Sequence, residues 1–192
     1  MKKIPAAFFA CMLLCSVASA QNNTDQKDYI GVSFLFNDFV TAERIRATST
    51  SNVIGNDQWA KFNEMSAGIG VHYFRGLKKH IDFAATATAS FARDAVIGKK
   101  SSDKSFLLEV DASALFKFVP DTYLVVPYAS AGLGATLFQN RFGSIIPLGL
   151  GLRINLDNTM LFTGAQYRIP VSVNTNNYHF MYHVGIASRL GN

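Results

Sequence analysis

Beyond residue 20 the chain contains no cysteine, because Cys11 and Cys15 are the only two and both lie near the N-terminus. That absence excludes disulfides, thiolate nucleophiles and cysteine-ligated metals from the rest of the chain. The same part also lacks any uninterrupted apolar stretch of the roughly 20 residues that a membrane-spanning helix needs. Yet 49% of all residues are hydrophobic. A closed β-barrel is the other structure that satisfies every backbone polar group in lipid, and it would explain this combination.

The first 20 residues have the order of a cleavable secretory signal. Two lysines precede an apolar run that ends in Ala18-Ser19-Ala20, just before Gln21. We therefore expect residues 1–20 to be removed and residues 21–192 to form one exported domain. A lipid anchor on one of the two cysteines is the lesser alternative, since Leu14 is too bulky a neighbour for Cys15 and Cys11 would leave a very short apolar region.

The charge balance is modest, which limits the classes of partner. The formal net charge of +5 falls to +3 without Lys2 and Lys3. We therefore expect no nucleic-acid partner. The excess would assist contact with anionic lipid head groups, or is simply loosely spread surface charge.

Period-two alternation divides the chain into eight segments of about the length of a tilted membrane strand. In 106–118, for example, Phe106, Leu108 and Val110 share one face, while Leu107, Glu109 and other residues occupy the opposite face. The eight predicted strands are 29–39, 65–75, 81–91, 106–118, 123–138, 149–156, 159–168 and 178–190. We expect an all-β fold, an eight-stranded antiparallel up-and-down transmembrane β-barrel.

The connections between these segments alternate between long and short. The short turns, at 76–79, 120–121 and 156–158, carry the Gly, Pro, Asp and Asn residues that turns require. The long links are 40–64, 92–105 and 169–177, with a smaller one at 139–143. Outer-membrane barrels place short turns in the periplasm and long loops outside, so we expect both termini to be periplasmic. Within 40–64 we expect a short helix at 56–62, and we expect Trp59 to pack on its own loop or on the barrel rim.

The polar face of the predicted strands carries charged residues, while the opposite face is rich in aromatic residues and leucine. A soluble lipocalin-type barrel would have the reverse arrangement, with the apolar face inside. We therefore expect the charged residues to face the lumen, where unpaired charges would be costly. The predicted structural network consists of Asp82, Glu109, Asp111, Lys117, Arg153, Arg168, Arg189 and His72, with Gln166 and Asn155 assisting. Eight strands leave an interior that side chains can fill, so this network would plug the lumen.

Inward glycines would make room for long side chains, or would mark places where the sheet bends. The glycines on the predicted inward face are those at 68, 70, 132, 134, 149, 151 and 185.

No catalytic, cofactor or metal motif stands out. His183 and Ser188 fall on different predicted faces, which argues against a Ser–His dyad. His179 and His183 share a face with His72, and we favour a structural or pH-responsive role for them over a metal site, because no carboxylate spacing strengthens the latter. The chain has no P-loop, dinucleotide fingerprint or zinc-protease motif. We therefore expect no enzyme activity, no cofactor and no metal.

The segment 149–158, with the sequence GLGLRINLDN, resembles the OmpA-like outer-membrane β-barrel family, as do 161–168 and 127–134. The resemblance spans the predicted mature chain. It implies an eight-stranded barrel in the bacterial outer membrane, partners among outer-membrane lipid and lipopolysaccharide, assembly by the barrel-insertion machinery, and roles in envelope anchoring or adhesion. It covers the barrel domain only, without the peptidoglycan-binding domain that many members carry. The usual terminal aromatic residue is also absent, which bears on the efficiency of insertion.

The leading hypothesis is a non-enzymatic outer-membrane barrel that supports the envelope or binds an extracellular ligand through its loops. The alternatives are a lipid A-modifying enzyme and a narrow channel or small-ligand carrier. The most informative observation would be whether Glu109, Asp111 and Arg153 face one another inside a closed barrel.

Overall fold

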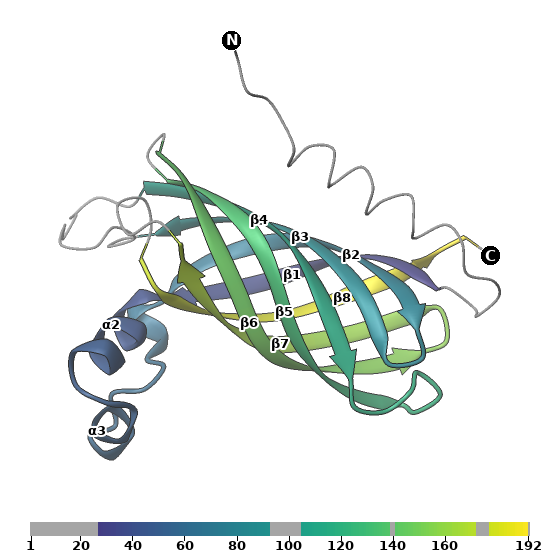
Figure 1. Ribbon diagram of the computed structural model, residues 1–192, viewed down its shortest axis with the longest axis horizontal. Coiled ribbons are helices and arrows are strands. Elements are labelled where there is room, and N and C mark those ends of the chain that lie inside the picture. Colours follow the sequence, from purple (N-terminus) through teal and green to yellow (C-terminus); the bar gives the residue numbers. More distant parts are fainter. Residues whose placement is uncertain (1–26, 93–104, 139–140, 172–176, 192) are drawn as a thin grey trace, which may run out of the picture.

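A computed structural model describes residues 27–92, 105–138, 141–171 and 177–191, and within them eight antiparallel strands close into a barrel (Figure 1). Each strand pairs with its neighbours in sequence, and β1 pairs with β8 to complete the ring. The predicted fold class is therefore confirmed. The strands are β1 (Asp28–Asp38), β2 (Ser66–Lys78), β3 (Ile81–Ala92), β4 (Ser105–Lys117), β5 (Val125–Phe138), β6 (Arg141–Leu156), β7 (Thr159–Pro170) and β8 (His179–Leu190).

Strand β6 begins well before its predicted start at residue 149. Both faces of its first half are apolar at Ile145 and Ile146, so the alternation on which the prediction rested is missing there. Pro147 also lies in this half, opposite Arg168 of β7. Proline cannot donate a backbone hydrogen bond, and a proline within a run argues against a strand when only the sequence is known. Pro147 has a register partner on β7 but none on β5, whose pairing with β6 passes from Leu148 to Ile145. The pairing of the residues on either side of it overrides the local signal.

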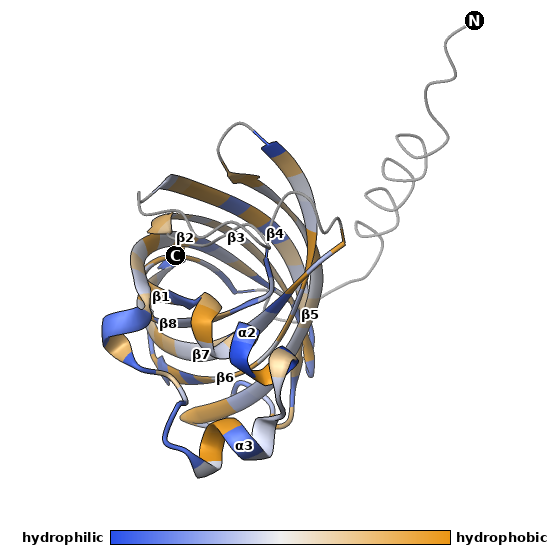
Figure 2. Cartoon of the chain, turned by 90° about the vertical axis from the view of Figure 1, so that its left-hand side faces the viewer, coloured by the Kyte–Doolittle hydropathy of each residue, from blue (hydrophilic) through white to orange (hydrophobic). Residues whose placement is uncertain are grey.

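The outer face of the barrel is apolar and exposed. Phe34 and Leu133 each retain 69% of their surface, and Leu150 retains 65%. Figure 2 shows the strands banded with hydrophobic and hydrophilic residues along their length, as alternation requires. An apolar surface of this extent is unfavourable in water and suits a hydrocarbon surrounding.

The interior is layered and is not wholly polar, which the sequence reading did not anticipate. One buried apolar cluster combines Phe74, Leu115, Tyr128 and Phe162 with smaller residues, and it lies among the inward-facing polar side chains. A second cluster contains Phe39, Ala92, Leu107 and Phe138. Because both clusters are made of inward-facing residues, the lumen contains apolar packing between and beyond its charged groups.

The long link between β1 and β2 carries two helices, α2 (Phe39–Ala47) and α3 (Thr50–Gly55), and a 3₁₀ turn, η1 (Phe62–Glu64). Asp38 caps α2 by accepting a hydrogen bond from the backbone N–H of Thr41 at 2.9 Å. The prediction of a helix at 56–62 was wrong. Asp57 and Ala60 have φ angles of 52° and 49°, which interrupt a right-handed helix.

Trp59, between α3 and η1, packs on the barrel rim as predicted. Its ring centroid lies 5.3 Å from that of Phe180 on β8. Trp59 remains 39% exposed. It is therefore a partly covered aromatic residue at the junction of the loop and the barrel.

The two ends of the barrel differ. Figure 1 shows α2 and α3 at one end, which we call the loop end, and the C-terminal end of β8 at the other. The connections β2–β3, β4–β5 and β6–β7 are at this second end, which we call the short-turn end. The β2–β3 and β6–β7 connections are short and the β1–β2 link is long, as predicted. The predicted alternation fails between them, because residues 118–124 separate β4 from β5, whereas only residues 139–140 separate β5 from β6. No helix among the described residues is long and apolar enough to cross a membrane.

Candidate functional site

The inward-facing side chains form two separate charged clusters, one toward each end of the barrel. The cluster nearer the loop end is centred on Arg168 of β7. Its Nη1 donates to Glu109 Oε2 at 3.0 Å, and its Nη2 donates to Asp111 Oδ2 at 2.8 Å and to Gln166 Oε1 at 3.1 Å. Arg168 is fully buried, and both carboxylates are nearly so. One guanidinium therefore pairs with two neighbouring acids of β4.

His179 extends this cluster and links it to the loop. Its Nε2 lies 3.3 Å from Glu109 Oε2, and its Nδ1 lies 3.1 Å from the carbonyl oxygen of Asn177. A carbonyl only accepts, so Nδ1 must carry a hydrogen to make the second contact. The Glu109 contact then needs a proton either on Nε2 or on the carboxyl group. In either case the added proton brings the summed formal charge of Glu109, Asp111, Arg168 and His179 closer to zero.

The first residue of α2 closes the loop end above this cluster. The ring of Phe39 lies 4.4 Å from that of His179, centroid to centroid, and also packs against Leu107 and Phe138. Figure 2, which views this end, shows α2 in front of the barrel opening. The charged groups beneath are consequently screened from solvent.

The second cluster lies nearer the short-turn end and is centred on Asp82 of β3. Asp82 accepts a hydrogen bond from Arg153 Nη1 at 2.5 Å and pairs with Lys117 Nζ at 2.8 Å. Lys117 also pairs with Asp121, which lies in the β4–β5 turn. Formal charge in this group of four is balanced. The guanidinium of Arg153 also lies over the rings of Phe74 and Tyr128, at 4.8 and 5.3 Å from their centroids.

Between the clusters lies a layer of histidine and aromatic residues. His72 Nε2 lies 2.7 Å from Ser33 Oγ, and its Nδ1 lies 3.3 Å from Thr86 Oγ1. The His72 ring is 5.6 Å from that of His183 and 4.8 Å from that of Phe162. The sequence reading did not foresee the Ser33–His72 contact. Thr86 is the third residue of this hydrogen-bonded group, in the place where a hydrolase triad has a carboxylate. All three side chains are buried in the lumen.

Six of the eight predicted network residues lie in the two clusters, and two do not. His72 bonds to hydroxyl groups and not to a charged partner. Arg189 lies on the inward face of β8, is partly exposed, and has no ion pair with an acid in the described ranges.

Glu109, Asp111 and Arg153 do not meet in one group. Arg153 pairs with Asp82, whereas the two acids pair with Arg168. All three expected residues do face inward, but they lie at different levels along the barrel. Sequence reasoning also missed Asp121 and His179 as cluster members. Asp121 lies in a turn, where residues do not alternate between two faces, so the sequence pattern did not assign it to the lumen.

Glycine makes room for large inward side chains at two positions. A Cβ atom at Gly151 would collide with the ring and hydroxyl of Tyr128, and one at Gly185 would collide with the ring of Phe162. Both large residues belong to the apolar layer. The expectation that inward glycines accommodate bulky neighbours is confirmed at these sites.

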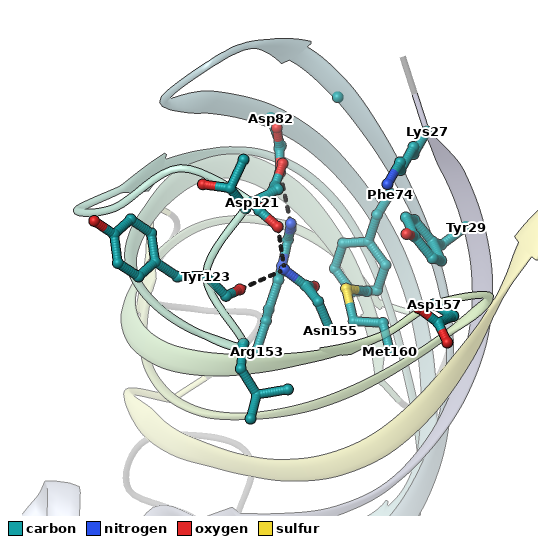
Figure 3. A pocket seen from close by; sticks show the side chains of 13 residues that line it. Lys27, Tyr29, Phe74, Asp82, Asp121, Tyr123, Arg153, Asn155, Asp157 and Met160 are labelled. Carbon is teal, nitrogen blue, oxygen red and sulfur yellow. Dashed lines mark hydrogen bonds and ion pairs between the residues drawn. The ribbon is translucent and has the colours of Figure 1, made fainter. Parts of the chain in front are cut away.

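A cavity of about 320 Å³ opens at the short-turn end (Figure 3). It lies beside Arg153 and below the β4–β5 turn. Asn155 Nδ2 holds that turn by donating to the backbone oxygens of Asp121 and Tyr123, at 3.2 and 3.3 Å. The residues that line the cavity are Lys27, Tyr29, Phe74, Gly76, Asp82, Asp121, Thr122, Tyr123, Leu124, Arg153, Asn155, Asp157 and Met160. Among the described residues, no group of three or more His, Cys, Asp or Glu side chains is placed to hold a metal ion.

The β1–β2 loop is fastened by an ion pair and a ring contact. Arg44 of α2 donates from Nη1 and Nη2 to the two carboxylate oxygens of Glu64, at 2.7 and 2.9 Å. This hydrogen-bonded pair lowers the pKa of Glu64 and raises the pKa of Arg44 from their ordinary values. Arg46 lies 3.8 Å from the ring centroid of Tyr178, beside β8. Helix α2 is therefore held against the rim through Arg46 and is joined to η1 through Arg44.

Comparison with known proteins shows a shared fold at low sequence identity. No family model matches the chain, and no curated protein matches it in sequence. Neisserial surface protein A matches with a TM-score of 0.55 and 16% identity, over 88% of this chain and 100% of its own. The attachment invasion locus protein of Yersinia pestis, in complex with the heparin analogue sucrose octasulfate, matches with a TM-score of 0.52 and 13% identity, over 87% and 100%.

The N-terminal β-barrel domain of Pseudomonas aeruginosa OprF also matches, with a TM-score of 0.52 and 12% identity, over 86% of this chain and 100% of the domain. These neighbours are eight-stranded outer-membrane β-barrels. The likeness to them concerns the fold, and on that level it agrees with the resemblance to OmpA-like barrels.

Proposed function

We propose that the protein is an integral barrel of the bacterial outer membrane that acts without catalysis, either by supporting the envelope or by binding an extracellular ligand through its loops. The single observation that carries this proposal is the exposed apolar face around a closed ring of eight strands. Such a face needs a hydrocarbon surrounding, and a closed barrel leaves no strand edge unpaired in it. The barrel folds of the three neighbours support the same location.

The proposed orientation places the short turns in the periplasm and α2 and α3 outside, as is usual for such barrels. Outer-membrane lipid would contact the apolar face, and lipopolysaccharide would contact the loop end. There the partly exposed Trp59, together with Arg46 over Tyr178, offers an aromatic and cationic rim suited to an interface. Export through residues 1–20, which lie outside the described residues, and insertion by the barrel-assembly machinery complete the proposal.

We also propose that the lumen is closed to ions. Phe39 covers the loop end, and the apolar layer around Phe74 and Phe162 fills the section between the charged clusters. The cavity beside Arg153 lies at the short-turn end and is bounded on one side by Phe74 and Met160 of that layer. A continuous water-filled path would have to pass both obstructions.

Migration in detergent gels provides the test of the barrel proposal. Unheated protein from the membrane fraction should migrate faster than boiled protein, because an intact barrel stays compact in detergent. Recovery of the processed chain as a soluble periplasmic monomer would overturn the proposal. Planar bilayers provide the test of the closed lumen: the protein should be silent, and steady single-channel steps would contradict closure.

A lipid-modifying activity is the competing function, and the Ser33–His72 contact is the observation that bears on it. That pair is directed into the lumen and away from the lipid face, so an acyl chain in the membrane does not reach it. Lipid A mass spectra of a deletion strain should match those of the parent. An altered acylation pattern, restored by the wild-type chain but not by Ser33→Ala, would favour the enzyme.

A further inference from the structure

Three large apolar side chains are exposed on one short segment of the β1–β2 loop. Ile54 of α3 retains 58% of its surface, Trp59 retains 39%, and Phe62 of η1 retains 76%. Ile54 and Trp59 also line one open hollow together with Asp57. Apolar side chains gathered in this way are unfavourable in water, so they indicate a surface that another apolar phase covers.

Two of these side chains lie against the outer wall of the barrel and not above its opening. The ring centroid of Phe62 is 5.8 Å from that of Phe36 on β1, and the ring of Trp59 lies against Phe180 on β8. Phe36 is on the same face of β1 as the exposed Phe34, and Phe180 is on the outward face of β8. The loop therefore extends the apolar outer face of the barrel at the loop end.

Aromatic residues of β7 and β8 continue the same rim. The ring of Tyr167 lies 4.9 Å from that of Phe180 and 6.0 Å from that of Tyr178, and the ring of Tyr182 lies 6.2 Å from that of Phe180. Tryptophan and tyrosine are enriched where a membrane meets water, because their rings are apolar while their N–H and O–H groups are polar. Trp59 joins this row of rings through Phe180 and so lies where the apolar outer face ends.

The charges of the loop indicate that apolar contact, and not attraction to anionic head groups, would hold it at a membrane. The segment 39–64 has a formal charge of zero, because its acids Glu43, Asp57 and Glu64 match its bases Arg44, Arg46 and Lys61. Arg44 and Glu64 are also paired with each other. A neutral bilayer should therefore be sufficient for contact.

The polar residues of the loop limit how deeply it enters the bilayer. Unpaired polar groups are costly in hydrocarbon, so the residues between Ile54 and Phe62 that are polar must remain among the head groups. We propose that the β1–β2 loop is a membrane-contacting loop, in which Ile54, Trp59 and Phe62 reach the acyl chains of the outer leaflet just below the head groups. This inference rests on the proposed membrane location of the barrel and names the partner of this loop as lipid.

Fluorescence quenching tests the inference in the full folded chain, because Trp59 is its only tryptophan. The chain is placed in nanodiscs of phosphatidylcholine whose acyl chains carry bromine either near the head group or near the bilayer centre. Shallow bromine should quench Trp59 about twofold more strongly than deep bromine, and iodide in the water should quench it weakly. Shallow bromine that quenches no more strongly than deep bromine would overturn the proposal, as would strong quenching by iodide. Shielding from both quenchers would mean that a second copy or the chain itself covers the loop, and would overturn it too.

Moving the tryptophan extends the test along the loop. In a Trp59→Phe chain, Phe62→Trp should respond to the quenchers as Trp59 does in the parent. Glu43→Trp in the same chain is the matched control, since Glu43 is exposed on α2, which lies in front of the barrel opening (Figure 2). Iodide should quench that control strongly and brominated lipid should quench it little. Equal quenching by shallow bromine at positions 43 and 62 would overturn the assignment of lipid contact to this face of the loop.

Leu133→Trp in the Trp59→Phe chain separates this inference from the membrane proposal. Leu133 is 69% exposed on the outer face of β5, so deep bromine should quench a tryptophan there if the barrel spans the bilayer. A response at position 133 without one at positions 59 and 62 would overturn the loop inference alone. No response at any of the three positions would overturn the membrane proposal together with it.

Discussion

Replacing Arg168 by methionine should cost the barrel a large part of its stability. The substitution keeps a long unbranched side chain but removes the guanidinium that pairs with both Glu109 and Asp111. Both carboxylates are almost fully buried. After the substitution, two neighbouring acids would remain in the lumen without the arginine that pairs with both of them.

The expected magnitude follows from the two hydrogen bonds of 3.0 and 2.8 Å that join Arg168 to the acids. A hydrogen bond to a charged group contributes about 1.5–3 kcal/mol, so two contribute about 3–6 kcal/mol. Removing one partner of a buried ion pair typically costs about 3–5 kcal/mol. Protonation of one orphaned acid would relieve part of the cost, so we expect Arg168→Met to lower the free energy of unfolding by about 4 kcal/mol.

Urea unfolding in micelles or vesicles provides the assay, with the fluorescence of Trp59 as the signal. Trp59 is the only tryptophan of the chain and contacts the barrel through Phe180. At a urea dependence of about 2 kcal/mol per molar, the expected loss lowers the midpoint by about 2 M. Arg75→Met is the matched control, because Arg75 is half-exposed and lies 3.9 Å from Asp28. It should cost less than about 1 kcal/mol.

A triple variant separates charge imbalance from lost packing. Arg168→Met combined with Glu109→Gln and Asp111→Asn removes all three formal charges and should recover most of the lost stability, since neutral groups are less costly to bury. The reasoning would be refuted if Arg168→Met remained within about 1 kcal/mol of the wild type, which is the value of an exposed ion pair. It would also be refuted if the triple variant were no more stable than the single one.

Three further predictions concern other parts of the molecule. Gly151→Val should destabilise the barrel by about 1–3 kcal/mol, because the new side chain would clash with Tyr128. Tyr128→Ala in the same chain should relieve the clash. Urea unfolding of the single and double variants measures both effects. The hydrogen bond from Arg44 lowers the pKa of Glu64 in the folded loop, so the ion pair stabilises the loop fully above the unfolded pKa of glutamate. This stabilisation is lost as the pH falls through the lowered pKa of the folded state. Limited proteolysis of the loop at a series of pH values should show the change, and Arg44→Gln should remove that pH dependence. Trp59→Ala should leave the gel shift of the intact barrel unchanged but increase cleavage within the β1–β2 loop, because the ring contact with the rim is lost; an unchanged cleavage rate would contradict this role.

The strands and their faces were predictable because each depends on short stretches of sequence. In β3, Asp82 and Thr86 face inward and Phe83 faces outward, as alternation required. The first half of β6 was not predictable in this way, because Ile145 and Ile146 remove the contrast between faces. The loop helices were displaced from their predicted position, since the cap at Asp38 and the positive φ angle at Asp57 outweighed the weak local pattern.

The sequence by itself determined that charged residues would face into a closed ring of eight strands, because a period of two assigns each residue to a face regardless of its distant neighbours. Only the tertiary structure decided which charges meet. Arg153 joins Asp82 across 71 positions of the chain, and Arg168 joins Glu109 across 59. The level of each inward residue depends on strand tilt and on the stagger between strands, which is a property of the whole closed barrel. The same stagger divides one expected network into two clusters.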